Sequence, residues 1–261
     1  MLNWWQALIL AVVEGLTEYL PVSSTGHLII ASALMGLNEE SFVKSFNIIV
    51  QFGAILSVMV LYWRRLLAPP SFYLKIAAGF LPAAVIGMLV KDEIDAILGS
   101  VEVVGAALFV GGLALIFIDR KPGRFDGGKT IAELSYKEAL LIGLCQCFAF
   151  IPGVSRSAAS IVGGLAAGLS RREAAEFSFF LAVPTLSGAT AIKVLKIAPT
   201  ITQDQIGIIL LGNLVSFIVG CLAIKGFIDF LAKRGFFAFG LYRVAVGVVI
   251  FILMAAGLRL S

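Results

Sequence analysis

The segment EGLTEYLPVSSTGH, Glu14–His27, places two carboxylates, a proline, four serine and threonine hydroxyls and the only histidine of the chain in an apolar neighbourhood. An apolar run, Trp4–Leu20, precedes Pro21, and a shorter one, His27–Leu37, follows it. Proline denies the backbone a donor and ends the first arm. Two such short arms do not make two comfortable crossings of a bilayer core of about 30 Å. The pattern predicts a re-entrant helix–loop–helix hairpin over residues 4–37.

A second segment repeats this pattern further along the chain. The apolar run Tyr136–Ile151 is interrupted by Pro152, and a short apolar arm, Ala158–Leu169, follows the polar loop. We therefore expect a second re-entrant hairpin over residues 135–169.

The composition defines the class of protein. The chain is 60% hydrophobic and only 14% charged, against about 25% charged residues in soluble domains. We expect an all-α integral membrane protein, without the basic groove or aromatic platform that nucleic acid requires. Six apolar runs are long enough to span a bilayer: Phe42–Trp63, Phe72–Val90, Val101–Ile118, Glu173–Val194, Gln205–Phe230 and Phe236–Leu258.

The order hairpin, three spans, linker, hairpin, three spans indicates an internal repeat. A shift of about 132 residues brings landmarks into register, among them Phe46 with Phe177, Gly105 with Gly240, and Gly112 with Gly247. Three spans are an odd number, so the second half inserts in the opposite orientation, as in inverted repeats with midplane binding sites. We predict one membrane domain over residues 1–261, with a first repeat at 1–118, a linker at 119–134 and a second repeat at 135–261.

The distribution of Lys and Arg sets the orientation. About 12 of the 20 lie on the face that includes the Arg64–Lys75 loop, and about 5 lie on the other. The positive-inside rule places the first face in the cytoplasm and both termini outside. The first hairpin then enters from outside and the second from inside, so their tips can meet. Arg156, Lys225 and Arg243 fall within the membrane.

The first tip carries Glu14 and Glu18, which lie one helical turn apart and share a face. Carboxylates in an apolar setting are costly unless they are paired, hydrated or bound to a cation. One interpretation is that both face water at the hairpin mouth. The other is a Mg²⁺ site, because this ion typically takes one or two carboxylates together with phosphate oxygens.

The loop after Pro21 supplies Ser23, Ser24 and Thr25, and His27 begins the second arm. Serines in such loops commonly serve as turn or capping residues. A hydroxyl beside an imidazole is also the nucleophile–base pairing of covalent catalysis. A histidine that only begins a helix is the plainer alternative.

The second tip reads PGVSRSAAS, Pro152–Ser160, with Arg156 between Ser155 and Ser157. An intramembrane guanidinium is by default a functional-site hypothesis, and its planar fork matches phosphate oxygens. The serine hydroxyls and the free amides of a helix start add an anion cradle. A structural ion pair with Glu14 or Glu18 is the alternative, and the two roles are compatible.

Together the tips resemble the two signature motifs of the undecaprenyl-diphosphate phosphatases, the bacitracin-resistance family of bacterial inner membranes. FNIIVQFGAIL (46–56) and EFSFFLAVPTLSGAT (176–190) are also similar to that family, so the resemblance covers essentially the whole chain. The family pattern usually ends its second motif with threonine, where this chain has Ser160.

The resemblance implies hydrolysis of undecaprenyl diphosphate to undecaprenyl phosphate and inorganic phosphate, which recycles the lipid carrier for wall polymers. It also implies a divalent cation, Mg²⁺ or Ca²⁺. Carried over by motif, the metal ligands would be Glu14 and Glu18, the latter also catalytic, and the phosphate would contact Ser23, Thr25, Ser155, Ser157 and Arg156. The nucleophile is left open: Ser24 with His27 as base, His27 itself, or water activated by His27.

From the predicted orientation we expect the site to open to the outer, periplasmic face of the inner membrane. The sequence leaves a homodimer open. An inverted-repeat transporter or lipid flippase for a phosphorylated substrate is the rival class, because midplane charges are common there. A channel would leave the two polar tips without a purpose.

Overall fold

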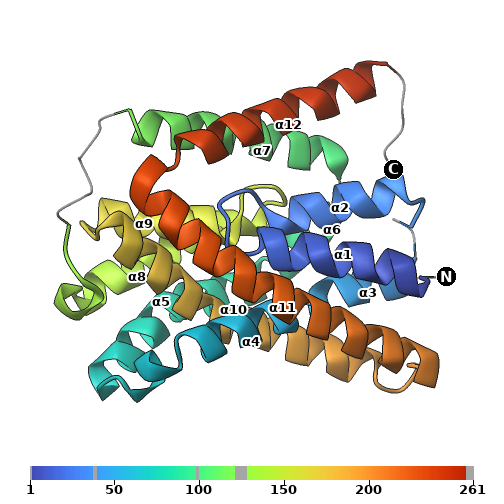
Figure 1. Cartoon of the computed structure of the whole chain (residues 1–261), viewed down its shortest axis with the longest axis horizontal. Helices are drawn as coiled ribbons and strands as arrows, with labels where there is room; N and C mark the ends of the chain where they lie inside the picture. Colours follow the sequence, from blue (N-terminus) through green and yellow to red (C-terminus); the bar gives the residue numbers. More distant parts are fainter. Residues whose placement is uncertain (1, 38–39, 98–99, 121–127, 257–261) are drawn as a thin grey trace.

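The computed structural model describes residues 2–37, 40–97, 100–120 and 128–256 (Figure 1), and these ranges contain no β-strand. Three short 3₁₀ turns are η1 (Trp63–Leu67), η2 (Ile131–Glu133) and η3 (Cys147–Phe150). The α-helices are α1 (Trp4–Thr17), α2 (Ser24–Leu34), α3 (Ser41–Ile49), α4 (Gln51–Leu61), α5 (Pro70–Leu89), α6 (Lys91–Ile97), α7 (Val101–Ile118), α8 (Tyr136–Gln146), α9 (Arg156–Ala166), α10 (Arg171–Ile197), α11 (Gln203–Arg234) and α12 (Phe237–Ala255).

Six helical segments are long and apolar enough to cross a membrane. They confirm the six predicted spans to within a few residues, although the predicted end at Leu258 lies outside the described residues. The protein is therefore a multi-pass membrane protein. The segments are Ser41–Leu61, Pro70–Leu89, Val101–Ile118, Arg171–Ile197, Gln203–Leu231 and Phe237–Ala255.

Two local features differ from the sequence-based expectation. The first span is not continuous, because α3 and α4 meet at a turn around Val50. Beside this turn the hydroxyl of Thr190 donates to the carbonyl oxygen of Ile48, at 3.2 Å, and the amide of Gly53 bonds the carbonyl of Val50 in a tighter turn, at 3.2 Å. In addition, the segment after the second span forms the short helix α6.

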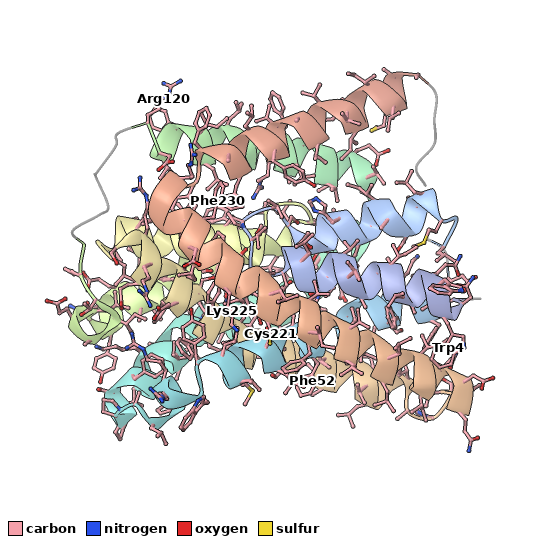
Figure 2. The ribbon with its side chains drawn as sticks, in the orientation of Figure 1. Trp4, Phe52, Arg120, Cys221, Lys225 and Phe230 are labelled. Carbon is pink, nitrogen blue, oxygen red and sulfur yellow. The ribbon has the colours of Figure 1, made fainter. Side chains whose placement is uncertain are left out.

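The outer surface is strongly apolar, as a bilayer solvent requires. Figure 2 labels Trp4, Phe52 and Phe230, whose exposed fractions are 51%, 38% and 38%. Exposed apolar side chains of this kind recur along most of the helices. Soluble monomers rarely present contiguous apolar areas on this scale, so lipid is the natural solvent for this surface.

Each region predicted as a re-entrant hairpin forms a pair of short helices joined by a loop, and its re-entry into the membrane stays a prediction. The first pairs α1 with α2, and the second pairs α8 with α9 through η3. At about 1.5 Å per residue, none of these arms reaches the roughly 30 Å thickness of a bilayer core. Entry from opposite leaflets stays a prediction.

The two halves pack crosswise. The first arm of each hairpin packs on a span of the other half, α1 on α11 and α8 on α5. Glycines permit this approach: a Cβ on Gly15 would lie 2.6 Å from the carbonyl oxygen of Ser216, and one on Gly143 would clash with the carbonyl of Gly79. Each hairpin is therefore held by the half of the chain to which it does not belong.

The spans α7 and α12 lie side by side at the top of Figure 1. A Cβ on Gly112 would lie 2.7 Å from the carbonyl oxygen of Gly240, and one on Gly247 would lie 2.9 Å from that of Gly105. The predicted repeat pairs Gly105 with Gly240 and Gly112 with Gly247, and a two-fold axis between the predicted halves would exchange these two contacts. The opposite insertion of the halves is a prediction that these contacts support.

The described part of the linker packs onto the body, whereas residues 121–127 lie outside the described ranges. Ile131 is buried in the main core, and the ammonium of Lys75 donates to the carbonyl oxygens of Ile131 and Ala132, at 3.0 and 2.7 Å. At the start of α8, a hydrogen bond from Lys129 lowers the pKa of Glu138 to about 2. These contacts tie the linker to α5 and to the second hairpin.

Candidate active site

The two loops meet at a cavity of about 210 Å³. Six of the predicted site residues line it, Glu18, Ser23, Ser24, Thr25, Ser155 and Arg156. Its remaining walls are polar at Gln51, Gln146 and Thr185 and largely apolar at Ala83, Ile94, Ala149, Phe150, Pro152, Gly153 and Leu186. A cavity lined by both charged or hydroxyl side chains and apolar side chains suits an amphiphile with a compact head group.

Two helices begin at this cavity. Ser23 caps α2 by accepting from the amide of Gly26, and Ser155 caps α9 by accepting from the amide of Ala158, both at 3.2 Å. The first amides of a helix have no intrahelical acceptor. Two helix N-termini thus supply donors to one cavity, an arrangement that favours an anion.

A chain of polar contacts crosses from one loop to the other. Arg156 Nη2 lies 2.6 Å from Glu18 Oε1, and the hydroxyl of Ser24 donates to Glu18 Oε2 in a short hydrogen bond. Arg156 Nη1 also donates to the carbonyl and the hydroxyl of Ser178, at 2.8 and 3.2 Å. The guanidinium lies over the ring of Tyr19 at 5.9 Å. The ion pair between Arg156 and Glu18, which the sequence offered as an alternative role for Arg156, is therefore present, and it joins the two hairpin loops.

Ser157 takes no part in these polar contacts around Arg156 and does not line the cavity. Its hydroxyl donates to the carbonyl oxygen of Leu20 at 2.8 Å, which fastens the second tip to the first. Ser160, the residue that departs from the family pattern, donates to the hydroxyl of Ser178 at 2.8 Å. A serine here supports the residue that holds Arg156.

Glu14 is fully buried and lies one turn before Glu18 on α1. Neither of its carboxylate oxygens accepts a hydrogen bond from a donor group among the described residues, and its carboxyl group lies within hydrogen-bond reach of that of Glu18. Two buried carboxyl groups in contact require a shared proton or a cation. The described residues contain no cluster of three acidic, histidine or cysteine ligands. Two glutamates together with phosphate oxygens fit Mg²⁺, which commonly keeps few protein ligands.

His27 lies apart from the cavity lining. Its Nδ1 lies 2.7 Å from the carbonyl oxygen of Ser23, and its Nε2 lies 2.7 Å from the hydroxyl of Tyr242 on α12. The two rings stack with their centroids 5.6 Å apart. Both ring nitrogens are thus engaged by groups other than Ser24.

Several residues of the site were missed by the sequence-based prediction. Gln51, Gln146 and Thr185 line the cavity but carry no charge that would single them out. Ser178 was equally inconspicuous within a span. Arg243 had a visible signal, a charge inside a span, and its guanidinium reaches both loops.

Lys225, the other intramembrane cation without an assigned partner, is exposed on α11 where that helix crosses α4 (Figure 2). It lines a separate cavity of about 350 Å³ with Tyr62 and Asp229. This cavity has no contact with the residues of the two loops.

These features define an integral membrane protein with a cavity, lined by charged and hydroxyl side chains, between two helix–loop–helix hairpins. The sequence model of the family described as bacitracin resistance protein BacA matches residues 7–249. The chain belongs to this family, which confirms the resemblance.

Curated relatives align over nearly the full length. The undecaprenyl-diphosphatase of Bdellovibrio bacteriovorus is 50% identical over 257 residues, 98% of each chain. That of Porphyromonas gingivalis is 47% identical over 98% of each chain. That of Aquifex aeolicus is 42% identical, over 94% of this chain and 96% of its own.

Proposed function

We propose that the protein hydrolyses undecaprenyl diphosphate to undecaprenyl phosphate and inorganic phosphate. The contact chain Ser24–Glu18–Arg156 in an amphiphilic cavity is the observation that carries this function. Its polar side supplies donors for a diphosphate, and its apolar side suits the first part of a prenyl tail. The names of the relatives support the substrate.

The hydrogen bond between Ser24 and Glu18 supports a covalent route. Glu18 accepts the hydroxyl proton while Ser24 Oγ bonds to the terminal phosphorus. The bond from this phosphorus to the bridging oxygen breaks, and undecaprenyl phosphate leaves with the electron pair. Glu18 passes the proton to the departing phosphate oxygen and is again a carboxylate. Water then attacks the phosphoserine: Glu18 takes one proton from the water and returns it to Ser24 Oγ as the Oγ–phosphorus bond breaks, and phosphate is released. Nucleophile and base within hydrogen-bond reach are the signature of such catalysis.

Arg156 stabilises the charge on the transferring phosphoryl group. Phosphoryl transfer depends chiefly on positioning and electrostatic stabilisation. The guanidinium is already oriented by Glu18 and Ser178, and its Nε has no hydrogen-bond partner in the part of the chain that is described. It lines the cavity beside the free amides of two helix starts, where a terminal phosphate would lie.

Of the three sequence-based alternatives for the nucleophile, the geometry favours Ser24. The general base is then Glu18, where the sequence-based alternative had His27. Both nitrogens of His27 are occupied, by Ser23 and Tyr242. His27 then holds the start of α2 in place and does not move the proton.

A divalent cation would be held by Glu14 and Glu18. When bound, it would neutralise negative charge on the diphosphate. The carboxylate of Glu14, buried beside that of Glu18 and without a donor group, is the observation in its favour.

We propose further that the enzyme works in the bacterial inner membrane, opens to the periplasm and confers bacitracin resistance. The cavity is lined by Ile94 of α6, and the Lys and Arg distribution places α6 outside. The family description supports the link to bacitracin.

The decisive experiment measures phosphate release from undecaprenyl diphosphate by purified protein, with and without a chelator. Release that requires the cation supports the proposal. A transporter or flippase would release no phosphate under either condition, and that result would reject the proposed hydrolysis.

A further inference from the structure

Arg243 of α12 is completely buried, although it lies within a membrane span. Its side chain extends from the α7–α12 pair, and its guanidinium lies between the loop after Pro21 and the loop after Pro152. Nη1 donates to the carbonyl oxygens of Pro21 and Val154, both at 3.0 Å. Nη2 donates to the carbonyl oxygens of Gly153, at 3.0 Å, and Ala107, at 3.1 Å.

The carbonyl groups of Pro21 and Gly153 occupy corresponding positions in the two halves. Each lies two residues before the serine that caps the second arm, Ser23 in one loop and Ser155 in the other. One guanidinium therefore binds equivalent atoms of both loops. In the predicted register that pairs Gly105 with Gly240, the position that corresponds to Arg243 in the first half is Leu108, so only the second half supplies this guanidinium.

The packing around Arg243 makes room for this arrangement. A Cβ on Gly111 of α7 would clash with its guanidinium, and one on Gly153 would lie 2.7 Å from the carbonyl oxygen of Val104. Glycine thus allows α7, the second loop and the guanidinium to meet.

The charge of Arg243 is offset by carbonyl dipoles alone. No carboxylate among the described residues forms an ion pair with it, in contrast to Arg156. An apolar side chain would fill this volume without the desolvation cost of a buried cation. The fork geometry, with two nitrogens each serving two acceptors, is what an apolar residue or a lysine lacks.

We propose that Arg243 is a positioning residue, which holds the two loops in register so that Ser24 and Arg156 act on the same phosphate. This inference rests on the proposed hydrolysis. Arg243 contacts only backbone atoms of the loops and acts through them.

The first experiment compares Arg243→Met and Arg243→Lys with a matched control, Lys75→Met. Lys75 is also a buried cation that donates to backbone carbonyls, but those carbonyls belong to the linker. We expect Arg243→Met to lower kcat about 100-fold, with KM changed less than about threefold, because misplaced groups lose rate more than affinity. Arg243→Lys should lose about tenfold and Lys75→Met less than about twofold.

The Lys variant keeps the charge, so it supplies the test if the Met variant does not fold. Full activity of folded Arg243→Lys, or an equal loss in Lys75→Met, would overturn the proposal.

A double-mutant cycle separates positioning from a general structural role. If Arg243 acts through Arg156, then adding Arg243→Met to Arg156→Ala should cost less than about threefold further, because coupled residues are non-additive. Losses that multiply across the two sites would show that Arg243 acts elsewhere.

Hydrogen exchange supplies a readout that needs no activity. Arg243→Met and Arg243→Lys should raise amide exchange in residues 20–26 and 152–158 together, whereas Lys75→Met should raise it in neither. Unchanged exchange in either loop would reject the inference. Absent phosphate release by the wild type would instead reject only the proposed hydrolysis.

Discussion

Ser23 and Ser155 both have an uncommon positive φ, of 71° and 77°. They are the only residues other than glycine with positive φ in the described ranges. Each begins the second arm of its hairpin, and each lines the cavity. A residue with a side chain pays about 1–3 kcal/mol for such a conformation, which persists where the surroundings fix it, often at active sites.

The N-cap hydrogen bond of Ser155 predicts that the alanine variant at this position is less stable than the glycine variant. Ser155→Ala keeps the strain and loses the acceptor for Ala158, so it should destabilise the protein by about 1 kcal/mol. Ser155→Gly loses the same bond but relieves the strain, so its cost should be a few tenths of a kcal/mol. Thermal unfolding in detergent measures both. An alanine variant as stable as the glycine variant would contradict the assignment.

Removal of Arg156 should lower the rate of phosphate release about 10²–10³-fold, by analogy with lost oxyanion donors. Arg172→Ala is the control, because the Arg172 side chain is 70% exposed and pairs with Glu176 away from the cavity. Steady-state release measures both variants. Near-normal turnover of Arg156→Ala would reject its role.

The nucleophile can be identified by trapping. Ser24→Ala should abolish turnover, and a trapped phosphoenzyme should map to Ser24. Tyr242→Phe, which removes the hydrogen bond to His27, should slow release less than about tenfold, as expected for a supporting contact. A phosphohistidine at position 27 would overturn this mechanism.

Replacing the buried carboxylate of Glu14 tests the cation site. Glu14→Gln should raise the cation concentration that gives half-maximal activity by at least about tenfold, because a ligand is lost. Titration of Mg²⁺ and Ca²⁺ measures this value. Glu138→Gln is the control, since Glu138 binds Lys129 at the far end of α8. An unchanged cation requirement would exclude Glu14 as a ligand.

Cysteine labelling tests the side to which the cavity opens. In a background with every native cysteine replaced, an impermeant reagent should label Asp92→Cys on α6 from outside and should not label Lys137→Cys. Both positions are exposed. The reverse pattern would invert the predicted orientation. The replaced residues are Cys145, Cys147 and Cys221.

Much of the fold was predictable because its signals are local. Apolar run length predicted the six spans, and the prolines after Leu20 and Ile151 marked the two loops, although α1 already ends at Thr17 and α8 at Gln146. The turn at Val50 was not predictable, because it coincides with a contact from Thr190, which is distant in sequence.

The site was predictable in its residue types and only partly in its pairings. The tips identified Glu18, Ser24 and Arg156, but the sequence paired Ser24 with His27, three residues away. In the structure the hydroxyl of Ser24 is instead hydrogen-bonded to Glu18, and the imidazole of His27 is hydrogen-bonded to Tyr242. Pairing across the halves depends on tertiary packing, which spacing along the chain does not encode.

The ion pair between Arg156 and Glu18 gives the cavity its own competitor for anions. In the proposed mechanism, an arriving diphosphate would displace this carboxylate, and the exchange would free Glu18 to take the proton of Ser24. When phosphate departs, the carboxylate would return to the guanidinium and so help to release the product. The ion pair would thus limit inhibition of the proposed enzyme by the phosphate that it generates.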